Sequence, residues 1–261
     1  MGEAIPIYTV DSFTSEPFRG NSAGVCLLVE PASEQWMQSV AGEMRHSETA
    51  FLRGRSLRWF TPVAEVALCG HATLATAHVL YSTGAARGAI EFDTLSGTLV
   101  TQHDASDGSI SMDFPALPAT EADPPAGLVE AMGVRPTWVG RSRFDYLIEV
   151  ASANEVLAAA PDLAALTLVE TRGVMLTAVS AEPGTDFVSR FFGPAVGVPE
   201  DPVTGSAHCT LAPYWSAKLG RPDLTGAQLS KRRGIVRTQL AGDRVRLSGH
   251  AVTVWSGQLL I

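Results

Sequence analysis

Short apolar segments separated by turn residues fill most of the first half of the chain. They are rich in Val, Ile, Leu and Phe, and Gly, Pro, Asn or Asp interrupts them, which is typical of strands. Strands are predicted at Ile5–Val10, Ala23–Leu28, Thr49–Leu52, Leu57–Phe60, Ile90–Asp93, Leu99–His103 and Ile110–Asp113. Helices are predicted only at Ser33–Glu43 and Gly70–Ser82 in this half. Apolar or small residues surround most of the second helix, so we expect it to be enclosed on several sides.

A proline-rich segment near the middle of the chain, 115–125, is the predicted linker between two halves. Beyond it the same plan returns, with strands followed by one long helix, Ser206–Leu219. Strands are predicted at Thr137–Gly140, Tyr146–Val150, Val174–Ala178, Phe187–Phe192, Val236–Leu240, Arg244–Ser248 and Ala251–Trp255.

Direct comparison of the halves indicates an internal duplication. Arg58–Pro62 (RWFTP) matches Arg190–Pro194 (RFFGP) at an offset of 132 residues, close to half of the chain. Gly70 then aligns with Gly205 after three extra residues in the second loop. The order of the matches and their strand-loop-helix context favour duplication over chance. We predict related halves at 1–117 and 118–261, with the last few residues rejoining the first half as an alternative.

Composition narrows the class of partner. The 261 residues include 19 Lys and Arg against 27 Asp and Glu, a net charge of −8, which argues against nucleic acid or an anionic membrane. A small-molecule ligand fits this charge better. The three cysteines have no C-x-x-C spacing, so we expect neither a disulfide framework nor a zinc ribbon but a cytoplasmic protein. No signal peptide and no apolar run of about 18 residues is found, so no membrane span is predicted.

Two helix starts at equivalent places in the repeat could bind an anion. The first turns near Gly70 and near Gly205 and Ser206 offer backbone N–H groups and the positive end of a helix dipole. Such donors suit a carboxylate substrate. The alternative is that both are ordinary helix starts with glycine in a tight turn.

Three ionisable residues are candidates for proton chemistry. Glu48 leads into an apolar strand, where partial desolvation would raise its pKa toward the neutral range; the alternative is a solvated glutamate at a strand end. His71 lies at a helix start, where the dipole favours a neutral ring. Asp201 lies between two prolines that hold its loop extended, and the alternative is a loop carboxylate with Thr204 capping the helix.

Other chemistries are disfavoured by spacing. His78 follows His71 by seven residues, which is ~10 Å along a helix and too far for two ligands of one ion, so no metal site is predicted. Cys69 precedes a helix start, yet Thr204 is its equivalent in the repeat, which disfavours a symmetric two-thiol epimerase and leaves a catalytic role of Cys69 open. No G-x-S-x-G surrounds any serine, so a serine hydrolase is not expected.

Several of these segments together resemble the PhzF, or phenazine-biosynthesis-like, family, which has the diaminopimelate-epimerase-like fold. The resemblance runs nearly end to end. The matching segments are Val10–Phe13, Gly20–Asn21, Ser47–Phe51, Phe60–Pro62, Cys69–Thr73, Phe92–Thr94, Glu200–His208, Gln228–Arg232 and Ser248–Ala251. The Cys-Gly-His-Ala-Thr and Asp-Pro-x-Thr-Gly-Ser-Ala motifs are specific in combination.

The resemblance implies an α+β fold of two pseudo-symmetric halves, each a mixed, barrel-like sheet around a central helix, with an active site in the cleft between them and often a homodimer. It implies that Glu48 is the general acid/base, and that His71, Asp201 and Ser206 bind and polarise the substrate together with the Gly70 and Gly205 amides. It further implies an isomerase without metal or organic cofactor.

Three functions remain open at this stage. The first is an isomerase that moves a proton within a small, cyclic or open-chain, amino or hydroxy carboxylate of a biosynthetic pathway. The second is a lyase or C–C hydrolase that uses the same residues, and the third is a non-catalytic small-molecule binding protein. The substrate itself is not carried over, since shared acid/base residues do not fix a reaction.

Overall fold

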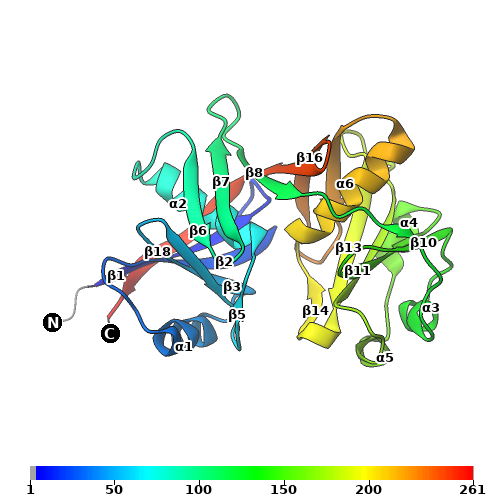
Figure 1. Ribbon diagram of the computed structural model, residues 1–261, viewed down its shortest axis with the longest axis horizontal. Helices are drawn as coiled ribbons and strands as arrows, with labels where there is room; N and C mark the ends of the chain where they lie inside the picture. The colour runs from blue at the N-terminus through cyan, green and yellow to red at the C-terminus, as the bar shows by residue number, and fades with distance from the viewer. Residues whose placement is uncertain (1–3, 261) are drawn as a thin grey trace. The chain divides into compact units, whose positions relative to one another are not determined.

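The computed structural model describes residues 4–260, which form two compact units (Figure 1). The first unit runs to Asp113 and takes in the chain again from Ser248 onward, whereas the second is Phe114–Leu247. The sequence places the division near residue 117 and leaves the return of the last residues as an alternative. In the structure the returning segment is a strand of the first unit, so the second unit is one continuous stretch of chain inserted into the first.

The first unit is a mixed sheet that surrounds one helix. Its strands are β1 Ile5–Ser12, β2 Asn21–Leu27, β3 Glu48–Arg53, β4 Ser56–Phe60, β5 Glu65–Val66, β6 Ile90–Thr94, β7 Gly97–His103, β8 Ile110–Pro115 and β18 Ala251–Leu259. Strand β18, red in Figure 1, pairs with β1 at the other end of the chain. The β2–β3 and β4–β6 pairs are parallel, while β1–β2, β3–β4, β4–β5, β6–β7 and β7–β8 are antiparallel.

Helix α2, Gly70–Ser82, is enclosed as its composition predicts. Every residue from His71 to Ala77 is buried, and the helix packs against β1, β2, β3, β7 and β18. A helix buried on all sides has no polar face to give to solvent, which explains its lack of amphipathic patterning. Helix α1, Glu34–Met44, packs on the other side of the sheet, where Met37 and Val40 contact Phe51 and Phe60.

The second unit contains more helices than the sequence predicts. Its strands are β9 Thr120–Glu121, β10 Trp138–Arg141, β11 Asp145–Glu149, β12 Gly173–Val179, β13 Phe187–Gly193, β14 Val198–Asp201, β15 Asp223–Gln228 and β16 Gly234–Ala241, and β17 Arg244–Gly249 leads back to the first unit. Its helices are α3 Leu128–Met132, α4 Ala153–Ala158, α5 Leu163–Thr167, the 3-10 turn Pro194–Val196 and the long α6 Gly205–Leu219.

Alternate residues of the second sheet pack against different helices. Leu147 and Met175 belong to the cluster that includes Leu211 and Trp215 of α6. Their neighbours Ile148 and Leu176 belong to the opposite cluster, with side chains from α3, α4 and α5. Because successive side chains of a strand point to opposite faces, a sheet covered on both faces needs a continuous apolar sequence, as these strands have.

The two units repeat one topology. In the first, β1–β2 is antiparallel, β2–β3 parallel, β3–β4 antiparallel and β4–β6 parallel; in the second, β10–β11, β11–β12, β12–β13 and β13–β15 follow the same order. Each unit then inserts its long helix after a short strand that pairs with the preceding one, β5 in the first and β14 in the second. Shared pairing of this kind agrees with the duplication inferred from the sequence.

Candidate functional site

Glu48 and His71 lie against each other in the first unit. Glu48 is the first residue of β3 and His71 the second residue of α2. The Oε2 atom of Glu48 is 3.2 Å from Nε2 of His71, and the two side chains are only 18% and 6% exposed. The sheet thus places a carboxyl group and an imidazole, far apart in sequence, in one largely dehydrated contact.

A shell of buried polar groups holds His71. Its carbonyl oxygen accepts a hydrogen bond from the Ser12 hydroxyl at 2.8 Å. Its Nδ1 lies 3.3 Å from Nδ2 of Asn21 and 3.5 Å from Sγ of Cys69. Asn21 in turn accepts a hydrogen bond on Oδ1 from the Ser47 hydroxyl at 3.1 Å. The Nδ1 edge of the ring is therefore held by buried neighbours, Asn21 and Cys69, while Nε2 lies near Glu48 without a hydrogen bond.

Burial keeps His71 neutral. Burial, together with a smaller contribution from charge repulsion by the nearby His46, lowers the pKa of His71 from 6.5 to about 3. The sequence attributes the neutral ring to the helix dipole, but desolvation is the larger cause in the structure. Neutral imidazole can donate from one nitrogen and accept at the other, which suits a partner of a proton-transferring carboxylate.

The beginning of α2 has no side-chain cap. The N-cap residue Cys69 is extended and makes no capping hydrogen bond with its thiol. First-turn N–H groups without a side-chain acceptor are the donors that an anionic ligand uses at a helix start. Gly70 lies at this start, as the sequence predicts.

Within residues 4–260, Glu48, Cys69 and His71 are also the group of three residues that could ligate one metal ion. One ligand atom from each lies within 4.8 Å of the others. However, the carboxyl oxygen contacts Nε2 of the ring and the thiol contacts Nδ1. One ion binds only one imidazole nitrogen, so the arrangement does not fit a metal without a rotation of the ring.

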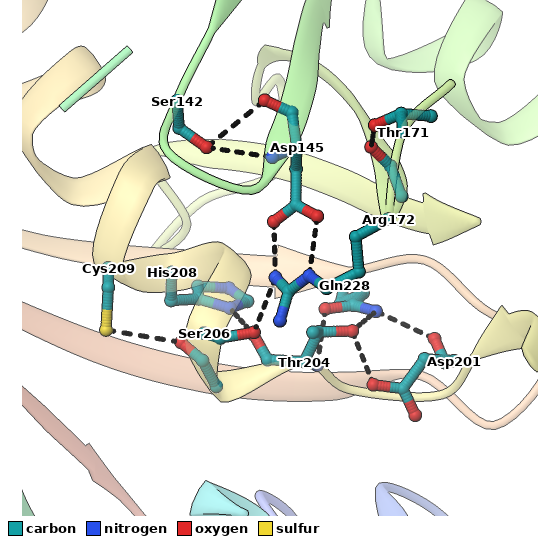
Figure 2. A network of polar contacts seen from close by, with 12 residues as sticks. Ser142, Asp145, Thr171, Arg172, Asp201, Thr204, Ser206, His208, Cys209 and Gln228 are labelled. Carbon is teal, nitrogen blue, oxygen red and sulfur yellow. Dashed lines mark hydrogen bonds and ion pairs between the residues drawn. The ribbon is translucent and has the colours of Figure 1, made fainter. Parts of the chain in front are cut away.

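In the second unit, Asp201 and Thr204 form one hydrogen-bonded turn before α6 (Figure 2). The Thr204 hydroxyl donates to Oδ2 of Asp201 at 2.6 Å, and so it does not cap the helix. Gln228 closes the turn: its Oε1 accepts from the Thr204 amide at 2.8 Å, and its Nε2 donates to the Asp201 carbonyl and to the Thr204 hydroxyl. This network, rather than proline stiffness alone, positions Asp201.

Ser206 is contacted by an arginine that the sequence did not single out. Nη2 of Arg172 donates to the Ser206 hydroxyl oxygen at 3.2 Å and also to Asp145, which accepts from Nε at 2.8 Å as well. Asp145 is buried, and the guanidinium lies over the rings of Phe144 and Phe191. Figure 2 shows Asp145, Arg172 and Ser206 in line. Because the serine oxygen accepts from Arg172, its own O–H remains available to a ligand.

His208, one turn further along α6, has a structural role. It is fully buried, and its Nδ1 donates to the Thr204 carbonyl at 2.8 Å. Burial lowers the pKa of His208 from 6.5 to about 4, so this ring is neutral too.

The structure therefore brings the predicted residues together in two sets. Glu48, Gly70 and His71 form one set in the first unit, and Asp201, Gly205 and Ser206 form the other in the second unit. Sequence reasoning missed Asn21, Arg172, Asp145 and Gln228 as parts of these sets. Asn21 and Gln228 lie in segments that carry the family resemblance, but nothing in the sequence shows which polar atoms they contact.

Comparisons with known proteins agree on the kind of protein that this chain resembles. The pattern of the phenazine biosynthesis-like protein family, PhzC-PhzF, matches residues 10–257. A protein of Halalkalibacterium halodurans named an uncharacterized isomerase is 48% identical over 98% of both chains. A crystal structure of a PhzC/PhzF protein from Clostridium difficile superposes with a TM-score of 0.92 at 40% identity, over 98% of this chain and 100% of that one.

A more distant neighbour shows how widely the fold is shared. The structure of a probable proline racemase from Agrobacterium radiobacter has a TM-score of 0.65 at 11% identity, covering 98% of this chain and 93% of that one. The α+β architecture expected from the sequence, with its epimerase-like fold, is thereby confirmed. Within residues 4–260, no helix is both long and apolar enough to span a bilayer.

Proposed function

Since the chain belongs to the PhzF, or phenazine biosynthesis-like, family and is an isomerase, we propose that it moves a proton within a small amino or hydroxy carboxylate. Glu48 takes a proton from one substrate atom and returns it to another, and the overall reaction consumes neither water nor an oxidant. His71 supports Glu48 from Nε2. The observation that carries this proposal is the 3.2 Å contact between Glu48 and a neutral imidazole in a site that excludes most water.

The second set of residues supports a carboxylate substrate. Ser206 has a hydroxyl hydrogen available to a ligand, since its oxygen accepts from Arg172. Gly205 and Ser206 begin α6, and its N-cap residue Thr204 makes no side-chain cap to the helix. We propose that Ser206 and the Gly70 and Gly205 amides bind the substrate, while Asp201, fixed by Thr204 and Gln228, orients or polarises it.

Chemistry at these residues needs no resident cofactor in this proposal. Dialysis against EDTA is expected to leave the turnover unchanged, and a loss that zinc restores would contradict it. We also propose a cytoplasmic homodimer that acts in a biosynthetic pathway. Light scattering of the purified chain tests the dimer, for which a mass of one chain would be the opposing result.

The first test replaces Glu48 by Gln, which keeps the size of the side chain and removes its basicity. Incubation with a cyclic amino carboxylate in heavy water is expected to place deuterium in the substrate with the wild type. Glu48→Gln is expected to lose this exchange by about 10²- to 10⁴-fold, the usual contribution of a general acid/base. A thermal-shift measurement is expected to show that substrate still stabilises the variant.

Glu30→Gln is the matched control, because Glu30 is exposed on the surface of the same unit. It is expected to exchange at the wild-type rate. Equal exchange by Glu48→Gln and Glu30→Gln would overturn the assignment. A product of changed mass would instead favour the lyase or C–C hydrolase reaction, since isomerisation leaves the mass unchanged.

A further inference from the structure

The position of one proton decides what His71 does for Glu48. The ring is buried and neutral, so either Nδ1 or Nε2 carries a hydrogen. With the proton on Nε2, the ring places an N–H 3.2 Å from Oε2 of Glu48, a contact that lacks the alignment of a hydrogen bond in this structure. With the proton on Nδ1, the ring turns a lone pair toward the carboxylate oxygen. The first arrangement stabilises a carboxylate, and the second repels it.

The groups at Nδ1 favour a ring that accepts there. The closest polar atom is Nδ2 of Asn21 at 3.3 Å, and an amide nitrogen only donates. The contact on the other side of this amide agrees with that orientation, since the Ser47 hydroxyl donates to Oδ1 of Asn21 at 3.1 Å. Amide and ring orientations of this kind are assigned from the whole hydrogen-bond network.

The Glu48 side of the ring leads to the same assignment. An ionised carboxylate only accepts, so a proton on Nε2 suits this neighbour better than a lone pair. Reversing the Asn21 amide would bring Oδ1 against Nδ1, draw the ring proton there and turn the Nε2 lone pair toward Glu48. With Glu48 ionised, the arrangement with the proton on Nε2 is the one that suits Asn21, His71 and Glu48 together.

We propose that Asn21 is a positioning residue that fixes the His71 tautomer, so that the ring proton is on Nε2, the nitrogen nearest to the Glu48 carboxyl group. This inference rests on the proposed function of Glu48 as the proton carrier. The positive end of the nearby Nε2–H dipole favours the charged form of the carboxylate, which is the form that accepts the first proton. It also favours release of that proton to the product, because the carboxylate is regenerated as the donor's partner.

Nitrogen NMR of the full chain tests the tautomer directly. Long-range ¹H–¹⁵N correlation at neutral pH distinguishes a protonated ring nitrogen from a bare one, and the His71 signals are identified by their loss in His71→Gln. We expect a protonated Nε2 and a bare Nδ1. A protonated Nδ1 in the wild type would overturn the proposal without any variant at Asn21.

Asn21→Asp tests the cause. It is isosteric, but its carboxylate only accepts, so we expect Nδ1 of His71 to become protonated. Deuterium exchange into substrate is expected to fall by about 10- to 100-fold, the range for groups that orient a functional histidine. The chain has one other asparagine, Asn154, which is exposed on α4; Asn154→Asp makes the same change of charge and is expected to leave both readouts unchanged.

The outcomes separate this inference from the proposed function. If Nδ1 of His71 stays unprotonated in a folded Asn21→Asp variant, Asn21 does not set the tautomer. This conclusion holds whatever the activity of Glu48→Gln. Full exchange by Glu48→Gln would instead remove the proposed function, while the NMR result on the tautomer would stand.

Discussion

Glu48 and Gly173 begin equivalent strands of the two units, yet the space available for a side chain differs between the two positions. Thr49 pairs with Phe60 in the first unit and Val174 with Phe192 in the second. Phe60 and Phe192 match in the repeat, so their strand partners Thr49 and Val174 are equivalent. Glu48 and Gly173, each one residue before those partners, therefore occupy equivalent positions.

The second unit has no room for a side chain at this place. A Cβ atom on Gly173 would lie 2.2 Å from the Phe191 ring. In the first unit the same place holds the carboxyl group beside His71. The duplication therefore kept the scaffold and left the carboxyl group in one copy only. A single proton carrier fits a proton shift better than a symmetric two-base racemisation.

Other side chains were kept in both copies. Arg58 forms a two-point ion pair with Glu65 of β5, and Arg190 forms the same pair with Glu200 of β14. Each guanidinium also lies over a phenylalanine two residues on, at 5.1 Å in the first unit and 4.8 Å in the second. These pairs hold the short strand before each long helix against its neighbouring strand, so we assign them a structural role.

The largest expected difference between the units is in the loss of unfolding free energy when these arginines are replaced. Arg190 is 13% exposed and also donates to the carbonyls of Val156 and Ala159, whereas Arg58 is 30% exposed. Arg190→Met is expected to lower the free energy of unfolding by about 3 kcal/mol, the lower end for buried pairs, because it leaves partly buried acceptors unpaired. Arg58→Met is expected to lower it by about 1 kcal/mol, near the upper end for surface pairs.

Urea unfolding of both variants measures this difference. The exposed Arg55, whose side chain is 55% exposed and pairs with Glu91 and Asp93, supplies the control Arg55→Met, with a loss under about 1 kcal/mol. Equal losses at Arg58 and Arg190 would show that burial does not separate the two pairs.

Next in size is the effect of acid on the buried histidines. The unfolded chain protonates histidine near pH 6.5, but folding lowers the pKa of His208 to about 4. Between these values the unfolded state binds more protons, so stability is complete above pH 6.5 and falls as the pH drops toward 4. The loss from His208 is on the order of 3 kcal/mol when titration is complete.

His208→Asn removes this titration. Urea unfolding from pH 7 to pH 4 is expected to show a shallower loss of stability than the wild type, although the variant is less stable at pH 7. His71, with its pKa lowered to about 3, contributes a loss of the same sign in the first unit. An unchanged slope in His208→Asn would mean that His208 is not neutral in the folded protein.

A smaller effect tests the crowding at Gly173 directly. Gly173→Ala is expected to destabilise the chain by about 1–3 kcal/mol through contact with Phe191. Phe191→Leu is expected to recover part of this loss in the double variant. Gly42→Ala, in α1 with its nearest neighbour at 3.5 Å, is the control and is expected to stabilise by up to about 1 kcal/mol. A neutral Gly173→Ala would mean that the second unit can accept a side chain here.

The smallest effect is expected at Cys69, the equivalent of Thr204. Cys69→Ser keeps a hydrogen-bonding group near Nδ1 of His71 and removes the thiol. Deuterium exchange is expected to fall by less than about tenfold, whereas loss of a true acid/base group costs about 10²- to 10⁴-fold. A loss in that larger range would make Cys69 a second proton carrier and revive the two-base alternative.

The long elements were predictable and the short ones were not. Gly70–Ser82 is predicted with the same bounds as α2, and α6 begins one residue before its predicted start. The helices α3, α4 and α5 have five or six residues, too few for a helical period to be visible. Strand β15, Asp223–Gln228, was also missed, because its apolar residues are few and Pro222 precedes it.

By itself the sequence indicated the duplication, the two buried helices and the family, and it proposed Glu48, His71, Asp201 and Ser206 as site residues, because periodicity and motifs are local or repeat at a fixed offset. Only the tertiary structure decided which atoms meet. The contact of Glu48 with Nε2 of His71, the Asn21 amide at Nδ1 and the Arg172 guanidinium at Ser206 each join segments 23 to 50 residues apart along the chain. Sheet pairing sets those distances, and burial then fixes the protonation state of the imidazole, which no local pattern of residues encodes.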